Sequence, residues 1–506
     1  MALSLPLASR VRALVHGDSL AMPLALLLAG HVLLWTWVGI TSRSNFDAPG
    51  DMVEAYVWAQ GWQWGYYKHP PLSAWVTGLW FKLVPESHAG FSLLAALNTA
   101  VGLAGLAWLA RDLLPRQWVL VVAVIASLTP GLTSLAMRFN ANAILVSTWP
   151  WAMALFVRMM QHGRTRDAIG CGIVCALAML GKYYSAVLLF TLLAAGLWLP
   201  AWRQRLASRT FAIALAVFAA CVLPHLLWLR SQAEGPLQYA RAAAGGDTGN
   251  SVLRALNFAL AQFAFPLIAM VVFAFVLTGP RRWPALRAAL LAPLLPRGQL
   301  VWLLAALPIV ATMLGTVLIG ARTASVWGLP IAGGLALLAA SRAQEAGARI
   351  DFSRLRRALL VVWVIVAAAS PLWWIVRTQA GSATGAEPRE ELAHALQSIW
   401  RQEQGRDLPW ISGTRALAAS VSFYAAAHPR YWSLWNASVE TPWTDAQAVR
   451  RDGGFIVCAH DDEACVALAT RWTAQQRTVA VAKSHLGWRF EPRTYRVFTL
   501  QPLPQP

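Results

Sequence analysis

The chain has 506 residues, of which 57% are hydrophobic and only 13% are charged. Soluble globular domains carry about 25% charged residues, so this composition excludes an ordinary soluble protein, and it also excludes a disordered chain or a collagen. Because one membrane crossing takes roughly 20 apolar residues, the long apolar runs predict a protein that crosses the membrane many times.

The formal net charge is +19, a value that is also typical of nucleic-acid-binding proteins. Here, however, the basic residues lie in short clusters between apolar runs, and every second loop is basic, as the positive-inside rule predicts. We therefore expect the charge to set topology and to contact anionic membrane lipid, and we expect no nucleic-acid partner. The clusters are Arg10/Arg12, Arg111/Arg116, Arg158/Arg164/Arg166, Arg203/Arg205/Arg209, Arg281/Arg282/Arg287/Arg297 and Arg342 to Arg357.

The apolar runs predict about eleven transmembrane helices. With the basic loops inside, the N-terminus is cytoplasmic. A small-residue cleavage site does not follow the first apolar run, which favours an uncleaved first helix over a signal peptide. The expected helices are residues 20–40, 88–110, 117–137, 143–160, 167–182, 184–201, 210–230, 253–278, 299–320, 326–341 and 357–376.

The segment 41–87 interrupts this rhythm of helices and short loops. It is too polar to span the membrane, and it is rich in Trp and Tyr, which favour the headgroup level. We predict an outside loop with two short interfacial helices. One runs from about Asp51 to Gln60, and the other starts near the Pro70-Pro71 pair, because Pro suits a first helical turn.

The tail, residues 377–506, is polar and charged. Its strand-like runs FIVCAH, TVAVAKSH and YRVFTLQ are separated by turn residues. We predict a small α/β domain on the periplasmic face, following a membrane domain of residues 1–376. At roughly 130 residues the tail is long enough to bury its own core.

The cysteines divide by location. Cys458 and Cys465 lie seven positions apart in the tail, where an oxidising compartment permits the disulfide that we predict. Cys171, Cys175 and Cys221 lie in expected membrane helices and are interpreted as small apolar packing residues. The His and Cys spacings do not resemble a zinc site.

Acidic residues are scarce, 23 in all, and several gather in the first outside loop. Asp47, Asp51 and Glu54 lie there together with Lys68 and His69. Asp51 and Glu54 are three apart, so a helix places both carboxylates on one face. One of them is a candidate general base with a raised pKa, while the other orients a donor or a metal. The alternative is a solvated helix start, where acidic residues are favoured.

The run from Trp64 to Leu72, WGYYKHPPL, with Trp75 behind it, resembles the first-loop signature of the bacterial glycosyltransferase family 39 group. That group includes relatives of dolichyl-phosphate-mannose protein mannosyltransferases and of lipid A aminoarabinose and galacturonic acid transferases. Its signature places an aromatic-Gly-Tyr-aromatic-x-His/Lys-Pro-Pro-Leu segment shortly after an Asp-Glu pair. Asp51 occupies the Asp position of that pair, whereas Met52 replaces the Glu, and Glu54 lies one turn further on.

Four later segments extend the resemblance over most of residues 20–340. The segment RFNAN at 138–142 resembles an Asp-x-Asp-like or Asn-x-Asn-like polar segment, and GKYYS at 181–185 resembles the Ser/Gly-Lys-Tyr segment at the outer end of the fifth helix. The other two fit later outer-end positions and are Pro224-His225 with Trp228, and Arg322 with Trp327 and Pro330. The tail resembles the outer domain of such proteins only by position.

The resemblance implies an all-α polytopic membrane protein of the C-type glycosyltransferase architecture, located in the bacterial cell inner membrane. Its expected activity is transfer of a hexosyl or pentosyl group from a polyprenyl-phosphate-linked donor to lipid A, another glycan or a protein. Asp51 takes the proton from an attacking hydroxyl, or orients the acceptor if the nucleophile is a phosphate. Membrane lipid and the sugar donor are the expected partners, and the acceptor stays open.

The remaining site residues divide by chemistry. Positive side chains offset the charge of a leaving phosphate, amides bind sugar hydroxyls, and aromatic rings offer flat faces. The phosphate-binding candidates are Lys68, His69, Lys182 and Arg322; the amides are Asn140 and Asn142; and the aromatic residues are Trp64, Tyr66, Tyr67 and Tyr183. A divalent metal ion is a further option, because it neutralises phosphate, although Met52 in place of a second carboxylate argues mildly against it.

Each of these residues also has a structural interpretation. Lys182 can be a snorkelling helix end, Arg322 a lone loop charge, and the two asparagines a turn and a helix cap. The aromatic residues can be interface anchors, and His225 can be structural. The rival function is a transporter or flippase that moves a lipid-linked sugar without chemistry. Internal repeats and charges at the membrane midplane are typical of transporters, and the acidic cluster in a loop favours the enzyme.

Overall fold

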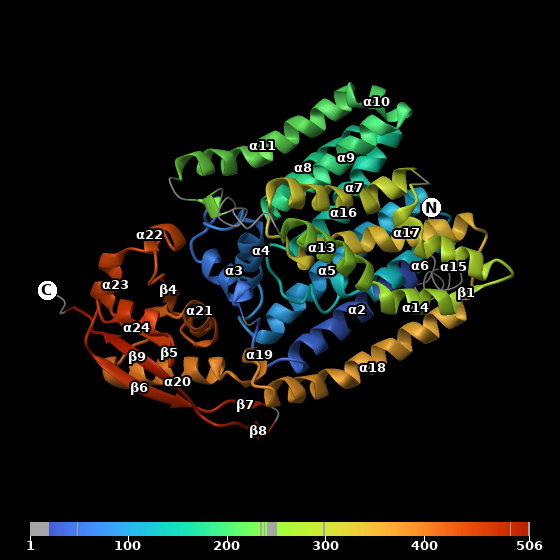
Figure 1. The fold of residues 1–506 in the computed structure, drawn as a ribbon. Helices are drawn as coiled ribbons and strands as arrows, with labels where there is room; N and C mark the ends of the chain where they lie inside the picture. The colour runs from blue at the N-terminus through green and yellow to red at the C-terminus, as the bar shows by residue number, and fades with distance from the viewer. Residues whose placement is uncertain are drawn as a thin grey trace, which may run out of the picture.

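The computed structural model describes residues 20–47, 49–232, 235–236, 238–239, 250–296, 299–485 and 487–503. A large helical bundle is joined to a smaller α/β region that contains the C-terminus (Figure 1). The expected cytoplasmic N-terminus, with Arg10 and Arg12, lies outside the described residues, as does Arg297.

The bundle is built from helices of 7 to 28 residues. Within the described residues they are α2 (Ala21–Thr41), α5 (His88–Leu113), α6 (Arg116–Ala126), α7 (Ile144–His162), α8 (Thr165–Gly181), α9 (Ala186–Trp198), α10 (Pro200–Leu206), α11 (Arg209–Ser231), α13 (Ser251–Ala264), α14 (Leu267–Val276), α15 (Arg282–Leu290), α16 (Gln299–Ile319), α17 (Ile331–Glu345) and α18 (Phe352–Gln379). Short 3-10 turns lie between them: η1 (Pro130–Leu132), η2 (Tyr183–Ser185), η4 (Ala292–Leu294) and η5 (Ser325–Gly328).

Six helices of the described chain are long and apolar enough to cross a membrane: α2, α5, α11, the joined α13 and α14, α16, and α18. A seventh is counted if η2–α9 and α10, bent by 114° at Leu199, form one span. Each predicted range contains a helix, but α6, α8 and α17 are shorter than a full span. The structure therefore supports a membrane-spanning bundle, and the count of about eleven spans is not confirmed.

The expected helix 117–137 is wrong in its second half. Helix α6 ends at Ala126, and Thr129 is extended, with φ −85° and ψ 137°. The physical cause is Pro130, because the residue before a proline is sterically disfavoured in the α region. The chain then continues through η1 as an irregular segment that reaches Asn140 and the start of α7.

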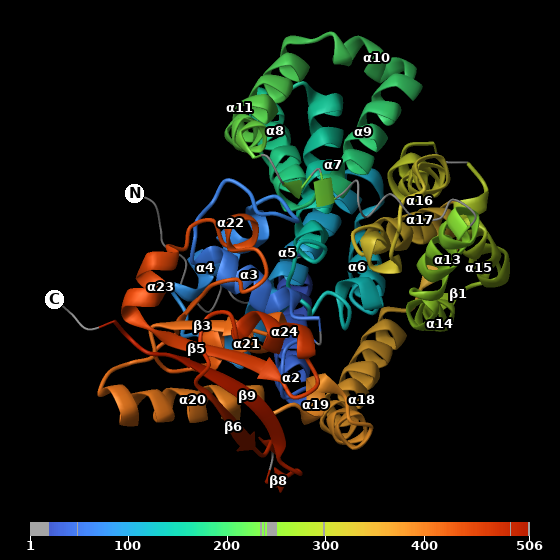
Figure 2. The same ribbon diagram turned by 60° about the vertical axis from the view of Figure 1, so that its left-hand side comes forward.

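The first loop folds into the two short helices that were predicted, α3 (Asp51–Ala59) and α4 (Leu72–Phe81). Pro71 lies immediately before α4 at its N-cap position. Most of α3 is buried, since it lies between the bundle and the α/β region (Figure 2). The first loop therefore fills the space between the two regions, and its helix α3 is not exposed on the surface.

The C-terminal region contains a five-stranded mixed sheet of order β4-β3-β5-β9-β6. Strand β3 pairs in parallel with β4 and β5, whereas β9 is antiparallel to β5 and β6, with Ile456 opposite Phe498. The strands are β3 (Trp410–Gly413), β4 (Arg430–Tyr431), β5 (Gly454–Ala459), β6 (Gln476–Val481) and β9 (Arg493–Leu500); β7 (Ser484–His485) and β8 (Trp488–Arg489) form a hairpin, and β1 (Leu277–Thr278) pairs with β2 (Arg349–Ile350) in the bundle.

Helices accompany this sheet, and one of them contacts the first loop. They are α19 (Ala383–Ala386), α20 (Arg389–Gln404), α21 (Arg415–Tyr424), α22 (Ala437–Glu440), α23 (Ala446–Asp452) and α24 (Glu463–Ala469). Helix α21 packs against α3, and a Cβ added at Gly50 would lie 2.8 Å from the Cβ of Ala416. Helix α18 runs on to Gln379, so the expected domain boundary at residue 376 falls inside its last turn. A disulfide joins Cys458 on β5 to Cys465 on α24.

Candidate functional site

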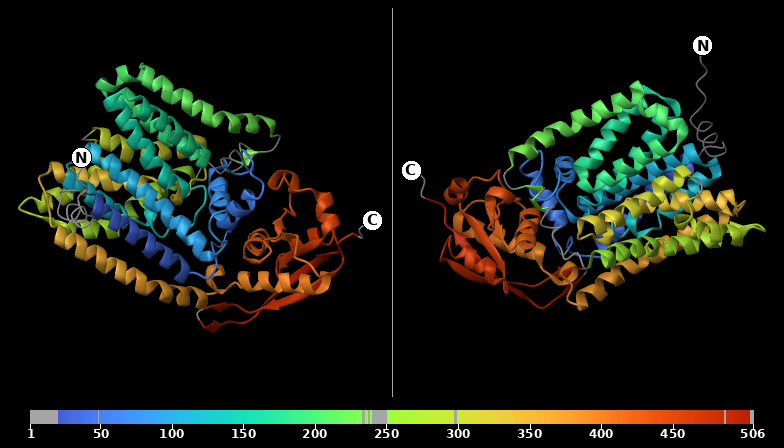
Figure 3. Two further views of the ribbon diagram at one scale, coloured as in Figure 1. Left: turned by 180° about the vertical axis from the view of Figure 1, so that it is seen from behind. Right: turned by 45° about the horizontal axis from the view of Figure 1, so that its top comes forward.

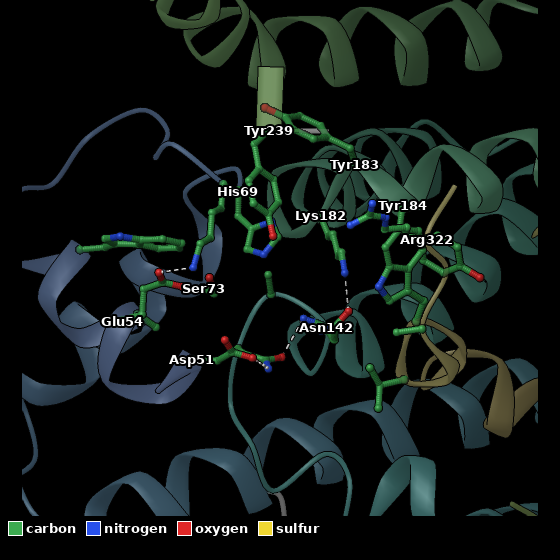
Figure 4. Close-up of a pocket in the computed structure, with 18 of the residues that line it drawn as sticks. Asp51, Glu54, His69, Ser73, Asn142, Lys182, Tyr183, Tyr184, Tyr239 and Arg322 are labelled. Carbon is green, nitrogen blue, oxygen red and sulfur yellow. Dashed lines mark hydrogen bonds and ion pairs between the residues drawn. The ribbon is translucent and has the colours of Figure 1, made fainter. Parts of the chain in front are cut away.

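A cavity of about 780 Å³ lies at the end of the bundle that faces the α/β region. Its walls come from α3, the segment before α4, the segment before α7, the junction of α8 and η2, and the chain between α16 and η5 (Figure 4). Segments far apart in the sequence thus supply one pocket. Its lining residues are Asp51, Glu54, Ala55, Trp58, Lys68, His69, Ser73, Asn140, Ala141, Asn142, Lys182, Tyr183, Tyr184, Tyr239, Ala321, Arg322, Ala324, Val326 and Trp327.

Asp51 is placed at the first turn of α3 by a cap. The two carboxylate oxygens of Asp47 accept hydrogen bonds from the backbone N–H groups of Asp51 (2.9 Å) and Met52 (3.0 Å). Such side-chain acceptors satisfy the unpaired N–H groups of a helix start. Gly50, with φ +85°, allows the turn that leads into the helix. Asp47 is therefore a structural carboxylate, and Asp51 is the one that faces the cavity.

Asn140 links Asp51 to the wall formed by the α7 segment. Its amide Nδ2 donates to Asp51 Oδ2 at 3.3 Å, while its Oδ1 accepts from the N–H groups of Asn142 (2.9 Å) and Ala143 (3.1 Å). Asn140 thus forms the expected turn and also contacts Asp51, while its binding of a sugar stays a prediction. Burial, and then the charge of Asp47, raise the pKa of Asp51, while Lys68, Asn140 and Lys182 oppose this shift.

Glu54 lies one turn after Asp51 and is held by two neighbours. Lys68 Nζ lies 2.6 Å from Glu54 Oε1, and the Tyr67 hydroxyl donates to the same oxygen at 3.1 Å. Burial raises the pKa of Glu54, and Lys68 opposes the shift. Both members of this ion pair line the cavity. Lys68 therefore reaches the site as a cation that is already neutralised.

Lys182 is a different kind of cation. It lies at the break between α8 and η2, where its extended backbone (φ −163°, ψ 139°) interrupts the helix. Its ammonium donates to Asn142 Oδ1 at 2.5 Å and lies 4.5 Å from the ring centroid of Trp327. The side chain is buried, and within the described chain it forms no ion pair with a carboxylate. This is a charge that a bound anion would neutralise.

The aromatic candidates and the histidines separate into lining and supporting residues. Tyr183 lines the cavity, whereas Tyr66 is buried against Trp58, with ring centroids 4.9 Å apart. His69 lines the cavity, and burial, followed by the charges of Lys182 and Lys68, lowers its pKa to about 3. His69 is therefore neutral at physiological pH.

His225 stands behind Tyr183 and is structural. Its Nδ1 lies 2.6 Å from the carbonyl oxygen of Trp64, and its Nε2 lies 2.9 Å from the Tyr183 hydroxyl. A carbonyl only accepts, so Nδ1 carries the proton and the hydroxyl of Tyr183 donates to Nε2. The histidine thereby fixes the ring of Tyr183 from outside the cavity. Tyr67, apart from its bond to Glu54, lines a smaller adjoining pocket with Arg415.

Arg322 lies at the cavity on the chain between α16 and η5, and its side chain is exposed. Among the lining residues that were not predicted are Ser73 and Tyr239. Ser73 follows the Pro-Pro-Leu run in the first turn of α4, and Tyr239 belongs to a polar stretch between two apolar runs. The position of Ser73 beside the motif is a signal that sequence reasoning had available, whereas nothing in the sequence distinguishes Tyr239 from an interface tyrosine.

The donor groups of the site do not form a metal-binding set. Among the described residues, no group of three or more His, Cys, Asp and Glu side chains could hold a metal ion. The nearest pair, Asp51 and Glu54, is engaged by an amide and by a lysine. We assign no step to a metal ion.

Comparisons with known proteins agree on one class. The family described as dolichyl-phosphate-mannose-protein mannosyltransferase matches residues 68–228, a range that begins inside the first-loop motif, at Lys68, and holds both asparagines and Lys182. A stretch of 225 residues is 27% identical to the lipid A galacturonosyltransferase RgtD of Rhizobium johnstonii and covers 43% of this chain and 47% of that protein. The match thus spans about half the length of this curated relative.

The whole fold is similar to ArnT from Cupriavidus metallidurans. Against the structure bound to undecaprenyl phosphate the TM-score is 0.62, with 16% sequence identity, and the match covers 96% of this chain and 100% of ArnT. Against the apo structure the TM-score is 0.60 over 94% of this chain and 98% of ArnT, again at 16% identity. The resemblance to family 39-like membrane glycosyltransferases that the first-loop motif predicted is confirmed, and the fold is that of a C-type glycosyltransferase.

Proposed function

We propose that this protein transfers a sugar from a polyprenyl-phosphate-linked donor to an acceptor at the periplasmic face of the bacterial inner membrane. The observation that carries the proposal is one cavity lined by the carboxylate of Asp51 and by the buried ammonium of Lys182, which has no carboxylate partner among the described residues. A galacturonosyltransferase acting on lipid A and a neighbour bound to undecaprenyl phosphate support the classes of acceptor and donor.

Lys182 is suited to the leaving phosphate. When the bond between the anomeric carbon and the phosphate oxygen breaks, negative charge grows on that oxygen, and a preorganised cation stabilises it. Arg322 at the same cavity adds a second positive group. His69, being neutral, offers a hydrogen bond but no charge, and Lys68 has its charge offset by Glu54.

Asp51 is suited to the role of general base. Its oxygen Oδ2 accepts from Asn140, so Oδ1 is left to take a proton from an acceptor hydroxyl. The hydroxyl oxygen then bonds to the anomeric carbon from the face opposite the leaving phosphate, which inverts that centre. If the acceptor is itself a phosphate, no proton is removed and Asp51 orients it. Asn140 and Asn142 offer amide groups to the sugar hydroxyls.

The topology that we propose with this function is the one expected from the sequence. The N-terminus is cytoplasmic, and residues 377–506 form a periplasmic α/β domain next to a membrane domain of residues 1–376. About eleven spans fit the alternation of basic loops, provided that the shorter helices α6, α8 and α17 also cross at least part of the bilayer. The Cys458–Cys465 disulfide supports an oxidising compartment for the tail.

The test is a transfer assay on the purified full-length protein. Incubation with a panel of polyprenyl-phosphate sugars should release free polyprenyl phosphate, and Asp51→Asn should lower that release by about 10³-fold, since general-base catalysis contributes roughly 10²–10⁴-fold. Asp461→Asn, an exposed carboxylate in the tail, serves as the matched control and should keep full activity.

Two outcomes would contradict the proposal. Full release by a folded Asp51→Asn protein would remove Asp51 from the role of base. Movement of a lipid-linked sugar across vesicles, with no release from any donor, would instead identify a flippase.

A further inference from the structure

Three arginines lie on chain segments that come together at the ends of α2 and α18, away from the cavity described above. Arg43 follows the last turn of α2, Arg377 lies in the last turn of α18, and Arg138 precedes α7. Helices α2 and α18 run side by side (Figure 3). The hydroxyls of Thr41 and Ser370 join their ends at 2.6 Å.

The packing of three phenylalanines brings the segment of Arg138 to the same place. Phe46, close behind Arg43, and Phe139, next to Arg138, both pack on Phe91, with ring centroids 5.1 and 6.5 Å away. The three arginines therefore come from three separate segments that the core holds together, and none of them lines the 780 Å³ cavity.

Carboxylates do not neutralise these charges. In the part of the chain that the structure describes, the guanidinium groups of Arg43 and Arg138 form no hydrogen bond or ion pair, and Arg377 has one contact, to Ser382 Oγ at 3.4 Å. Asp47 is the acidic residue whose charge acts on Arg43, and both of its carboxylate oxygens are already used by backbone N–H groups at the start of α3.

The charges also repel one another. Burial, followed by the positive charge of Arg138, lowers the pKa of Arg43 to about 10; Asp47 opposes the shift and Arg377 adds to it. Gathering three positive charges near the single carboxylate of Asp47 is unfavourable, so the arrangement is the one expected when a further anion from outside the chain completes it. Arginine suits phosphate in particular, because its planar donors bind two oxygens at once.

The surroundings indicate that this anion belongs to a lipid. Next to Arg377, α18 exposes Leu372 (62%), Trp373 (55%) and Val376 (56%), an apolar face suited to contact with the bilayer. An arginine at this end of a span lies at headgroup level, where lipid phosphates are found. In the topology proposed above this is the outer end, where the positive-inside rule disfavours basic residues, so topology does not account for the three of them.

We propose that Arg43, Arg138 and Arg377 bind the phosphate group of a membrane lipid that enters from the bilayer beside α18. This is a second phosphate site, separate from the cavity that holds Lys182. The proposed function is needed only to assign this lipid site to the outer face of the membrane. The arginine cluster and the apolar face of α18 do not depend on which reaction the protein catalyses.

The binding test uses the full-length protein in detergent micelles, titrated with dioleoyl phosphatidic acid and followed by native mass spectrometry. The double variant Arg138→Gln/Arg377→Gln should bind this lipid about tenfold more weakly, while binding of uncharged dioleoylglycerol is unchanged. Arg43 is kept because it is half-buried. The control Arg450→Gln/Arg471→Gln removes two exposed arginines from the α/β region, away from the basic loops expected to contact lipid, and should bind as the wild type does. Equal phosphatidic acid binding by the double variant and the wild type would overturn the proposal.

A second measurement distinguishes the two sources of such a phosphate. If the site holds the acceptor, the double variant should raise the KM for phosphorylated lipid A and leave that for its dephosphorylated form unchanged. If it holds a resident phospholipid, transfer kinetics stay the same although phosphatidic acid binding is weaker. Failure of the wild type to release polyprenyl phosphate from any donor would refute the proposed function, and the binding result would still decide this site.

Discussion

The two lysines of the cavity differ in the partner that each side chain has. Lys68 comes from the first loop and is paired with Glu54 at 2.6 Å, whereas Lys182 comes from the α8–η2 break and meets the neutral amide oxygen of Asn142. One wall of the cavity holds a lysine that is paired with a carboxylate, and the other holds a buried lysine with no carboxylate partner among the described residues. A substrate phosphate is therefore drawn to the Lys182 wall, which leaves the sugar between that wall and Asp51.

The sharpest test of this asymmetry is Lys182→Met. Removing a preorganised charge from the leaving group should lower donor-dependent release by about 10²–10³-fold, as measured by initial rates of polyprenyl phosphate release. Lys182→Arg, which keeps the charge, should retain a larger part of the activity. If Lys182→Met were no worse than Lys68→Met, the proposed difference between the two walls would be wrong.

A smaller effect is expected on the wall that holds the paired lysine. Lys68→Met leaves Glu54 buried without its cation, and this should cost about tenfold in kcat/KM. Adding Glu54→Gln removes the stranded charge, so the double variant Glu54→Gln/Lys68→Met should recover part of the loss. If the loss in kcat/KM of the double variant, expressed as free energy, equalled the sum of the losses of the two single variants, Lys68 would act on the substrate directly and not through its ion pair with Glu54.

The pH profile sharpens the role of Asp51. Its pKa is raised, and the base must be deprotonated, so kcat/KM should fall as the pH drops through a value above the ordinary Asp pKa of about 3.9. Asn140→Ala removes a hydrogen bond that lowers this pKa, so its acid limb should move to higher pH. If the acid limb of the Asn140→Ala profile stayed at the wild-type pH, a group other than Asp51 would control the fall of kcat/KM at low pH.

The smallest effect concerns the contact between the first loop and the tail. His428 Nε2 lies 2.8 Å from Glu86 Oε2, and this hydrogen bond raises the pKa of His428. The stabilisation is complete below the unfolded His pKa of about 6.5 and is lost as the pH rises through the higher folded value. Glu86→Gln should therefore destabilise the protein by about 1 kcal/mol or less at pH 6 and not at pH 9.

Thermal melting in detergent at the two pH values measures this difference. Glu463→Gln, which breaks an ion pair with Arg496 instead of a histidine, is the control and should behave alike at both. A pH-independent loss in Glu86→Gln would mean that packing, not the protonated histidine, carries the contact.

Much of the fold could be predicted because its signals are local. Apolar runs mark helices, and the Pro70-Pro71 pair marks the start of α4 within two residues. The error at residues 117–137 arose because a continuous apolar run outweighed Pro130, whose steric effect ended the helical conformation before it. Helix lengths in the bundle were predicted less well, since they depend on where neighbouring helices meet.

The site was predictable as a set of residues but not as an arrangement. The first-loop motif pointed to Asp51, Lys68 and His69, all of which line the cavity. The contact between Asn142 and Lys182 joins positions 40 apart and is set by how α7 packs on α8. The burial of Tyr66 and the pairing of Glu54 follow from packing as well, so no local pattern could have assigned them.

The cap on α3 has a consequence for how the protein is made. Arg389 donates to the backbone carbonyl of Asp47 across 342 positions, and the amide of Asn45 donates to the carbonyls of Ala383 and Glu387. At a synthesis rate of about 5–20 residues per second, these partners follow the first loop by roughly 20–70 s. In the topology proposed above, the loop that carries Asp51 has therefore crossed the membrane before the residues that support it are synthesised. A nascent chain arrested before residue 383 would hold the whole first-loop motif and still lack the contacts that fix it.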